Sequence, residues 1–160
     1  MTALADEIGR GISVIRSLSD EVYRSVPDGP RGVGDQFRHN LDFVTCLLSG
    51  LEFGRIDYCD RERDVLVETD REHAIDRFAR ASARLAAVDP RAMARRVLVR
   101  SEIDVSEWLP SSIGREVEFV HSHTVHHHAL IAERLAALGI GAVRNFGVAP
   151  STLKYWSAAA

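Results

Sequence analysis

Apolar residues recur every three or four positions along four stretches of the chain, which is the period of a helix with one buried face. The four stretches cover residues 3 to 25, 33 to 53, 68 to 88, and a last one from Ser111 or Ser112 to Leu138. An Asp-Pro pair at 89–90 follows the third stretch, and Gly139 follows the fourth, as expected at helix ends. The pattern predicts an all-α fold, a four-helix bundle formed by one domain over residues 1–160.

The segments between these helices carry weaker signals. Residues 26–32 hold two prolines and two glycines and predict a break, and the charged, aperiodic residues 54–66 predict a connecting loop. Residues 95–105 alternate enough to predict a short strand or hairpin before the last long helix. In the glycine-rich tail, residues 150–153 (PSTL) predict one short final turn. We expect Phe146, Tyr155 and Trp156 to cover the open end of the bundle, although this tail is also able to form a pocket wall.

Composition excludes several classes of protein. The net charge is −3 and the arginines are scattered among acids, so we expect no nucleic-acid partner. Two cysteines are too few for a disulfide framework, and no apolar run reaches the roughly 18 residues of a membrane span. The N-terminal residues lack the apolar stretch of a secretory signal, so a cytoplasmic protein without a membrane partner is expected.

Histidines gather in the last predicted helix, where five of the seven fall between His121 and His128. His123 and His127 are four residues apart, so they share one helical face beside the apolar stripe and are able to bind one ion. The best third ligand is His39, in the middle of the second helix. Three imidazoles predict a divalent transition-metal site, with zinc preferred and nickel, iron or manganese as alternatives.

The histidine cluster also has two interpretations that involve no metal site. A coincidental cluster on a helix surface needs no ion at all. A purification-tag remnant is disfavoured because the cluster is internal, is interrupted by Ser122, Thr124 and Val125, and lies within a helical pattern. His126 and His128 are interpreted as flanking residues or as solvent-facing ones.

Polar residues near the predicted ligands are candidates for the surrounding shell or the pocket. Asp42 follows His39 by three residues and shares its helical face, which suits a carboxylate that orients a ligand. His126 is a second candidate, beside the ligand pair. Tyr58 and Arg61, from the loop at 54–66, are expected to form a polar rim that binds an anionic substrate. The alternatives without a functional role are a solvated loop at 54–66 and a surface acid at Asp42.

The chain resembles the DinB-like superfamily of metal-binding four-helix bundles, and within it an uncharacterised bacterial subgroup. The resemblance rests on GDQFRHNLDFVTCLLSG at 34–50, SHTVHHHALI at 122–131 and FGVAPSTLKY at 146–155. It implies that His39 is the first metal ligand and that His123 and His127 are the HxxxH pair. Many members continue that pair with Arg-Gly-Gln, whereas this chain continues with His128, Ala129 and Leu130.

The resemblance implies a metal-dependent enzyme, a transferase or hydrolase, that keeps an open position on the ion. The ion would activate a low-molecular-weight thiol or water for attack on a small-molecule substrate. A homodimer is a further family expectation. The alternative is a non-catalytic binding or sensor protein that only holds the metal, which a fourth ligand such as His126 would favour. No catalytic residue is assigned from the sequence.

Overall fold

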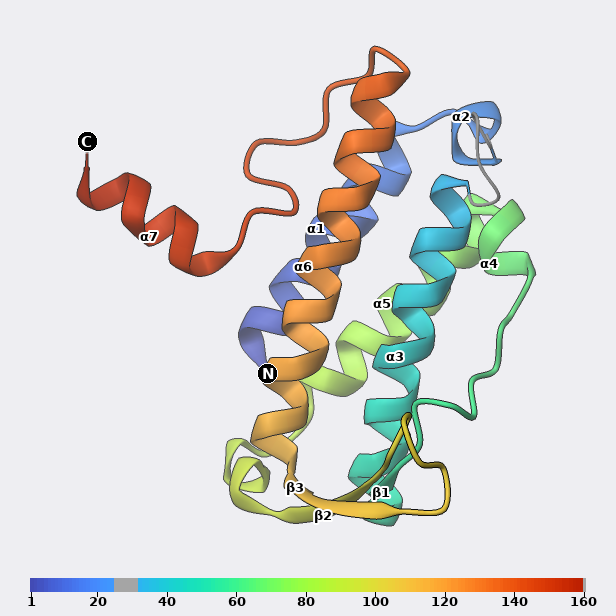
Figure 1. Ribbon diagram of the computed structural model, residues 1–160. Helices are drawn as coiled ribbons and strands as arrows, with labels where there is room; N and C mark the ends of the chain where they lie inside the picture. The colour runs from blue at the N-terminus through green and yellow to red at the C-terminus, as the bar shows by residue number, and fades with distance from the viewer. Residues whose placement is uncertain (25–31, 160) are drawn as a thin grey trace.

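Most of the chain is helical in the computed structural model, which describes residues 1–24 and 32–159. The four long helices are α1 (Thr2–Ser17), α3 (Val33–Phe53), α5 (Arg71–Ala86) and α6 (Ile113–Ala137). Helices α1 and α3 each contact both α5 and α6, so the four enclose one core (Figure 1). The predicted helical class is therefore correct, and nearly all of the predicted break at 26–32 lies outside the described residues.

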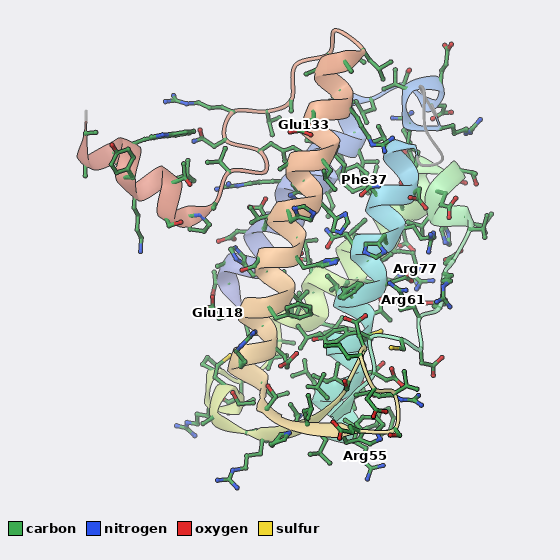
Figure 2. All side chains as sticks on the ribbon, in the orientation of Figure 1. Phe37, Arg55, Arg61, Arg77, Glu118 and Glu133 are labelled. Atoms are coloured by element: carbon green, nitrogen blue, oxygen red, sulfur yellow. The ribbon has the colours of Figure 1, made fainter. Side chains whose placement is uncertain are left out.

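Aromatic side chains connect the helices inside this core. The Phe37 ring on α3 lies 6.1 Å from Tyr23 and 6.0 Å from Phe78, measured between ring centroids, and it points in among the helices (Figure 2). The buried Tyr23 hydroxyl donates a 2.5 Å hydrogen bond to the carbonyl oxygen of Val67. The Phe37–Phe78 contact packs α3 against α5, and the Phe37–Tyr23 contact packs α3 against the segment that precedes it in the chain.

The first predicted helix is two helices in the structure. Helix α1 ends at Ser17 because Leu18 adopts an extended conformation, and the short helix α2 follows over Asp20–Arg24. The Arg71 guanidinium donates to the carbonyl oxygen of Leu18, which satisfies an acceptor that the break leaves free. The prediction of one continuous helix over 3–25 was therefore wrong. The residue that stabilises the break, Arg71, lies far along the chain, so local periodicity does not reveal it.

A three-stranded sheet closes one end of the helices (Figure 1). Strands β2 (Arg96–Arg100) and β3 (Trp108–Ser112) form an antiparallel hairpin. Strand β2 confirms a strand within the predicted range 95–105, whereas its partner β3 lies beyond that range. Strand β1 (Arg55–Ile56) pairs in parallel with β2, so the loop expected at 54–66 was only partly correct. A strand of two residues is too short to show any alternation in sequence.

Side chains define the starts of the last two long helices. The predicted third helix divides into α4 (Leu66–Thr69) and α5, because the Asp70 carboxylate accepts the backbone N–H of His73 and starts a new helix. A short 3₁₀ helix over Pro90–Ala94 then leads into the hairpin. The Ser112 hydroxyl accepts the Arg115 N–H at 3.3 Å, so Ser112 is the N-cap of α6, one of the two predicted.

The tail departs from the cover predicted for it. Phe146 is buried and stacks on His128, with 4.2 Å between ring centroids. Tyr155 and Trp156 are instead 71% and 52% exposed on α7 (Pro150–Ala158), which extends away from the other helices (Figure 1). Only Phe146 therefore covers the core as expected. No helix in the described ranges combines the length and apolarity needed to cross a membrane.

Candidate metal centre

Three histidines from two helices meet where α3 and α6 pack side by side. His39 comes from α3, and His123 and His127 come from α6, one helical turn apart. Each offers a ring nitrogen, and these nitrogens all lie within 4.8 Å of one another. The ring centroids of His39 and His127 are 4.5 Å apart, and those of His123 and His127 are 4.4 Å apart. The structure thus brings together the three residues that the sequence predicted as ligands.

These spacings are close to what one ion requires. Two nitrogens that each lie about 2.0–2.1 Å from one tetrahedral metal are about 3.4 Å apart. The widest pair that the 4.8 Å limit allows would therefore have to close by about 1.4 Å when the ion binds. Rotation of the imidazole side chains is the movement that would close it.

Burial keeps two of these imidazoles neutral. Desolvation, together with the charge of the neighbouring histidines, lowers the pKa of His123 to about 4 and that of His127 to about 3. At neutral pH both rings therefore carry a lone pair rather than a second proton. A neutral imidazole is the form that binds a metal.

Hydrogen bonding orients one ring and leaves another unsatisfied. His127 Nδ1 lies 2.7 Å from Oε1 of Gln36, and because an amide oxygen only accepts, Nδ1–H donates and Nε2 keeps its lone pair. His123 Nδ1 is buried and has no hydrogen-bond partner within residues 1–24 and 32–159. A buried nitrogen without a partner is costly in a protein interior. This set of donors fits a divalent transition ion.

An aromatic stack forms the wall behind His123. Phe43 stacks on the His123 ring at 3.9 Å between centroids, and Tyr58 stacks on Phe43 at 5.1 Å. The Tyr58 hydroxyl donates to Glu116 Oε2 at 3.0 Å. Tyr58 is thus buried behind the centre and supports Phe43, rather than standing on the expected polar rim.

The loop after β1 places Arg61 beside the centre. Asp42 on α3 accepts the backbone N–H of Arg63 at 3.1 Å and pairs with Arg38, so this carboxylate anchors the loop. Arg61 Nη1 lies 3.4 Å from His39 Nδ1. Its guanidinium carbon lies over the Phe43 ring, 5.5 Å from the ring centroid, which is a cation–π contact.

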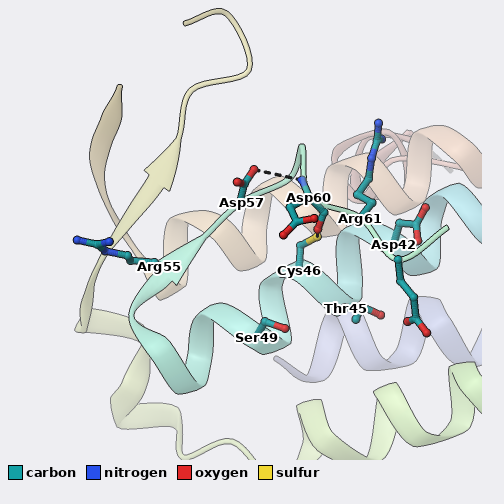
Figure 3. A pocket seen from close by; sticks show the side chains of 9 residues that line it. Asp42, Thr45, Cys46, Ser49, Arg55, Asp57, Asp60 and Arg61 are labelled. Carbon is teal, nitrogen blue, oxygen red and sulfur yellow. Dashed lines mark hydrogen bonds between the residues drawn. The ribbon is translucent and has the colours of Figure 1, made fainter. Parts of the chain in front are cut away.

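A pocket of 370 Å³ lies between α3 and this loop (Figure 3). Asp42, Cys46, Asp60 and Arg61 are among the residues that line it, and the Arg61 side chain extends away from Cys46. Burial raises the pKa of the Cys46 thiol to about 12, so Cys46 is a packed thiol and not a reactive thiolate.

The other histidines of α6 lie outside the cluster. His126 is exposed, with its ring 5.2 Å from that of His127. His128 is 1% exposed and its Nδ1 lies 2.7 Å from Glu7 Oε1 on α1, so the interpretation of His128 as flanking or solvent-facing was wrong. Neither Gln36 nor Glu7 was predicted from the sequence. Gln36 precedes His39 by three residues on one helical face, a usable signal, whereas nothing near Glu7 indicates a histidine partner.

Comparisons with known proteins supply no family for the chain. No family model matches it, and no solved structure matches it. One curated relative is FK506-binding protein 5 of Rhizopus delemar, which is 29% identical over 104 residues. The match covers 62% of this chain, and the chain spans 27% of the relative's length.

Proposed function

We propose that this protein binds a divalent transition metal, preferably zinc, through His39, His123 and His127. The observation that carries the proposal is the cluster of three nitrogens within 4.8 Å of one another, two of them on neutral rings, of which His127 is buried and His123 is half-buried. The contact between His127 and Gln36 supports it further, because ligand histidines commonly donate their other N–H to an oxygen.

We further propose that the protein is a metal-dependent enzyme of the DinB-like type, built as a four-helix bundle. Its support is the order of the helices, with the first histidine on α3 and the HxxxH pair on α6, as the resemblance implies. Three protein ligands leave a position open on the ion, and an ion so held activates water or a low-molecular-weight thiol. In this chain Phe43 excludes water from one side of the centre and Arg61 places a positive charge beside it.

The test of the metal site is elemental analysis of the purified protein without a tag. Wild type is expected to hold about one equivalent of a transition metal. His39→Ala, His123→Ala and His127→Ala are each expected to lose it, while His121→Ala and His126→Ala are matched controls that retain it. Absence of metal from the wild type after reconstitution, or its loss from the His121 variant alone, would overturn the assignment.

A metal-holding protein without turnover is the second candidate. One observation favours it: Asp42, the carboxylate predicted beside His39, is engaged with Arg38 and with the Arg63 backbone and is not a free base. Thiol-transfer and hydrolysis assays on the metal-loaded wild type separate the two candidates, with the His127→Ala variant as the background. A small-molecule substrate and the formation of a homodimer remain predictions from the resemblance.

A further inference from the structure

Arg61 is a cation beside the centre whose hydrogen-bonding capacity is largely unused. Its Nε atom is buried and has no acceptor among the residues that the structure describes. Within residues 1–24 and 32–159, its Nη1 atom reaches His39 Nδ1 alone, at the long distance of 3.4 Å. A guanidinium has five N–H donors and no acceptor, and a buried donor without a partner is costly.

Binding of an ion removes even the contact with His39. The guanidinium only donates, so Nδ1 of His39 accepts in the arrangement seen here. If His39 binds an ion through Nε2, its Nδ1 carries the proton and no longer accepts from Arg61. If it binds through Nδ1, the ion takes the lone pair that Arg61 now uses. In either case Arg61 needs a new acceptor once the ion is present.

The carboxylates around Arg61 already have partners. Asp42 pairs with Arg38, Asp57 pairs with Arg100 at 2.9 Å, and Glu62 pairs with Arg77. The remaining neighbour is Asp60, whose side chain is exposed to water. Asp42 attracts Arg61 through space, but among the residues that the structure describes no carboxylate forms an ion pair or a hydrogen bond with Arg61. Arg61 therefore lacks a direct anionic partner beside a divalent ion, and two such cations repel each other.

We propose that Arg61 makes the open side of the three-histidine centre selective for small ligands that carry a carboxylate. This inference rests on the metal site proposed above and names the class of ligand that it takes. A carboxylate has two oxygens with several lone pairs, so it offers acceptors to the ion and to the guanidinium together. A neutral ligand of the ion leaves Arg61 without an acceptor.

The experiment uses cobalt(II)-loaded full-length protein, because the visible absorption of the ion reports binding of an added ligand without any turnover. Acetate is the carboxylate probe and imidazole is the neutral probe, each titrated against wild type and against Arg61→Gln. We expect Arg61→Gln to weaken acetate binding about tenfold, the size of one charge-assisted hydrogen bond. Imidazole binding and cobalt stoichiometry should not change.

Two further variants sharpen the result. Arg61→Lys keeps the charge but loses the planar fork, so its acetate affinity should lie between those of wild type and Arg61→Gln. Asp60→Asn should leave acetate affinity unchanged; a clear increase would identify Asp60 as the partner of Arg61 and overturn the proposal.

The remaining outcomes separate this inference from the metal site itself. A wild type that binds no cobalt overturns both proposals. A wild type that binds cobalt, with acetate affinity equal in wild type and Arg61→Gln, overturns only the role of Arg61. A parallel loss of acetate and imidazole binding in Arg61→Gln also overturns it, since it would show a general disturbance of the centre and no selectivity.

Discussion

His127 Nδ1 lies 2.7 Å from Oε1 of Gln36, and both side chains are buried between α6 and α3. This contact fixes the tautomer of the ring and the direction of its other nitrogen. Removing such a partner commonly costs about 10- to 100-fold in metal affinity.

We therefore predict that Gln36→Ala binds zinc about 10- to 100-fold more weakly than wild type, with unchanged stoichiometry. Competition against a chromophoric chelator measures the affinity. Gln36→Glu is the matched variant, because a carboxylate also accepts from Nδ1, and it should restore tight binding. Equal affinities in wild type and Gln36→Ala would show that the contact does not support the ligand.

Acid should destabilise the metal-free protein through His123 and His127, the partly and fully buried imidazoles of the centre. The pKa values of His123 and His127 are lowered by burial to about 4 and about 3, against 6.5 for the ordinary side chain. At a pH between the native and the ordinary pKa values, these two histidines bind protons in the unfolded chain but not in the native one. The free energy of unfolding therefore falls as the pH falls from 6.5 towards 4. Well above pH 6.5 these two groups contribute no pH dependence.

Urea denaturation of the metal-free protein at about pH 7.5, 6 and 5 measures this effect. A double variant, His123→Gln with His127→Gln, should lose less stability over the same pH range than wild type does. Parallel pH profiles for the two proteins would exclude the buried histidines as the cause.

The buried pair of Glu7 and His128 ties α1 to α6 and is expected to be structural. Glu7→Ala leaves His128 Nδ1 without its 2.7 Å partner in the core, so we predict a loss of roughly 2 to 4 kcal/mol in the free energy of unfolding. Arg10→Ala is the control, because Arg10 contacts Glu7 from the surface at 3.4 Å and should matter little. Metal stoichiometry should stay unchanged in both variants; its loss in Glu7→Ala would assign the pair to the centre.

Two glycines of α1 offer a test of the packing around His128. A Cβ at Gly11 would lie 2.9 Å from His128 Nε2, whereas a Cβ at Gly9 would meet nothing within 4 Å. We predict that Gly11→Ala lowers stability by about 1 to 3 kcal/mol through overpacking. Gly9→Ala should raise it by up to about 1 kcal/mol, because alanine favours a helix. Thermal unfolding of the two variants checks the difference, and the same sign for both would contradict the packing.

Local spacing was enough to predict much of the molecule. The helical class, the strand β2 before α6 and the cap at Ser112 follow from periodicity and from residues close in sequence, because a helix or a strand is shaped by neighbours a few positions apart. The shared face of His123 and His127 has the same origin, since four residues make about one helical turn. His39 could be selected because it is one of only two histidines outside the cluster and lies in the middle of an amphipathic helix.

Tertiary packing decided the rest. Helix α1 ends at Ser17, where Leu18 becomes extended, and the carbonyl oxygen of Leu18 finds its partner in Arg71, 53 residues later. His128 is buried because Glu7, 121 residues earlier, reaches it across the interface of α1 and α6. Arg61 lies beside His39 because Asp42 holds the loop on α3. Sequence periodicity says which face of a helix is buried, but partners between distant segments are fixed only when the helices pack.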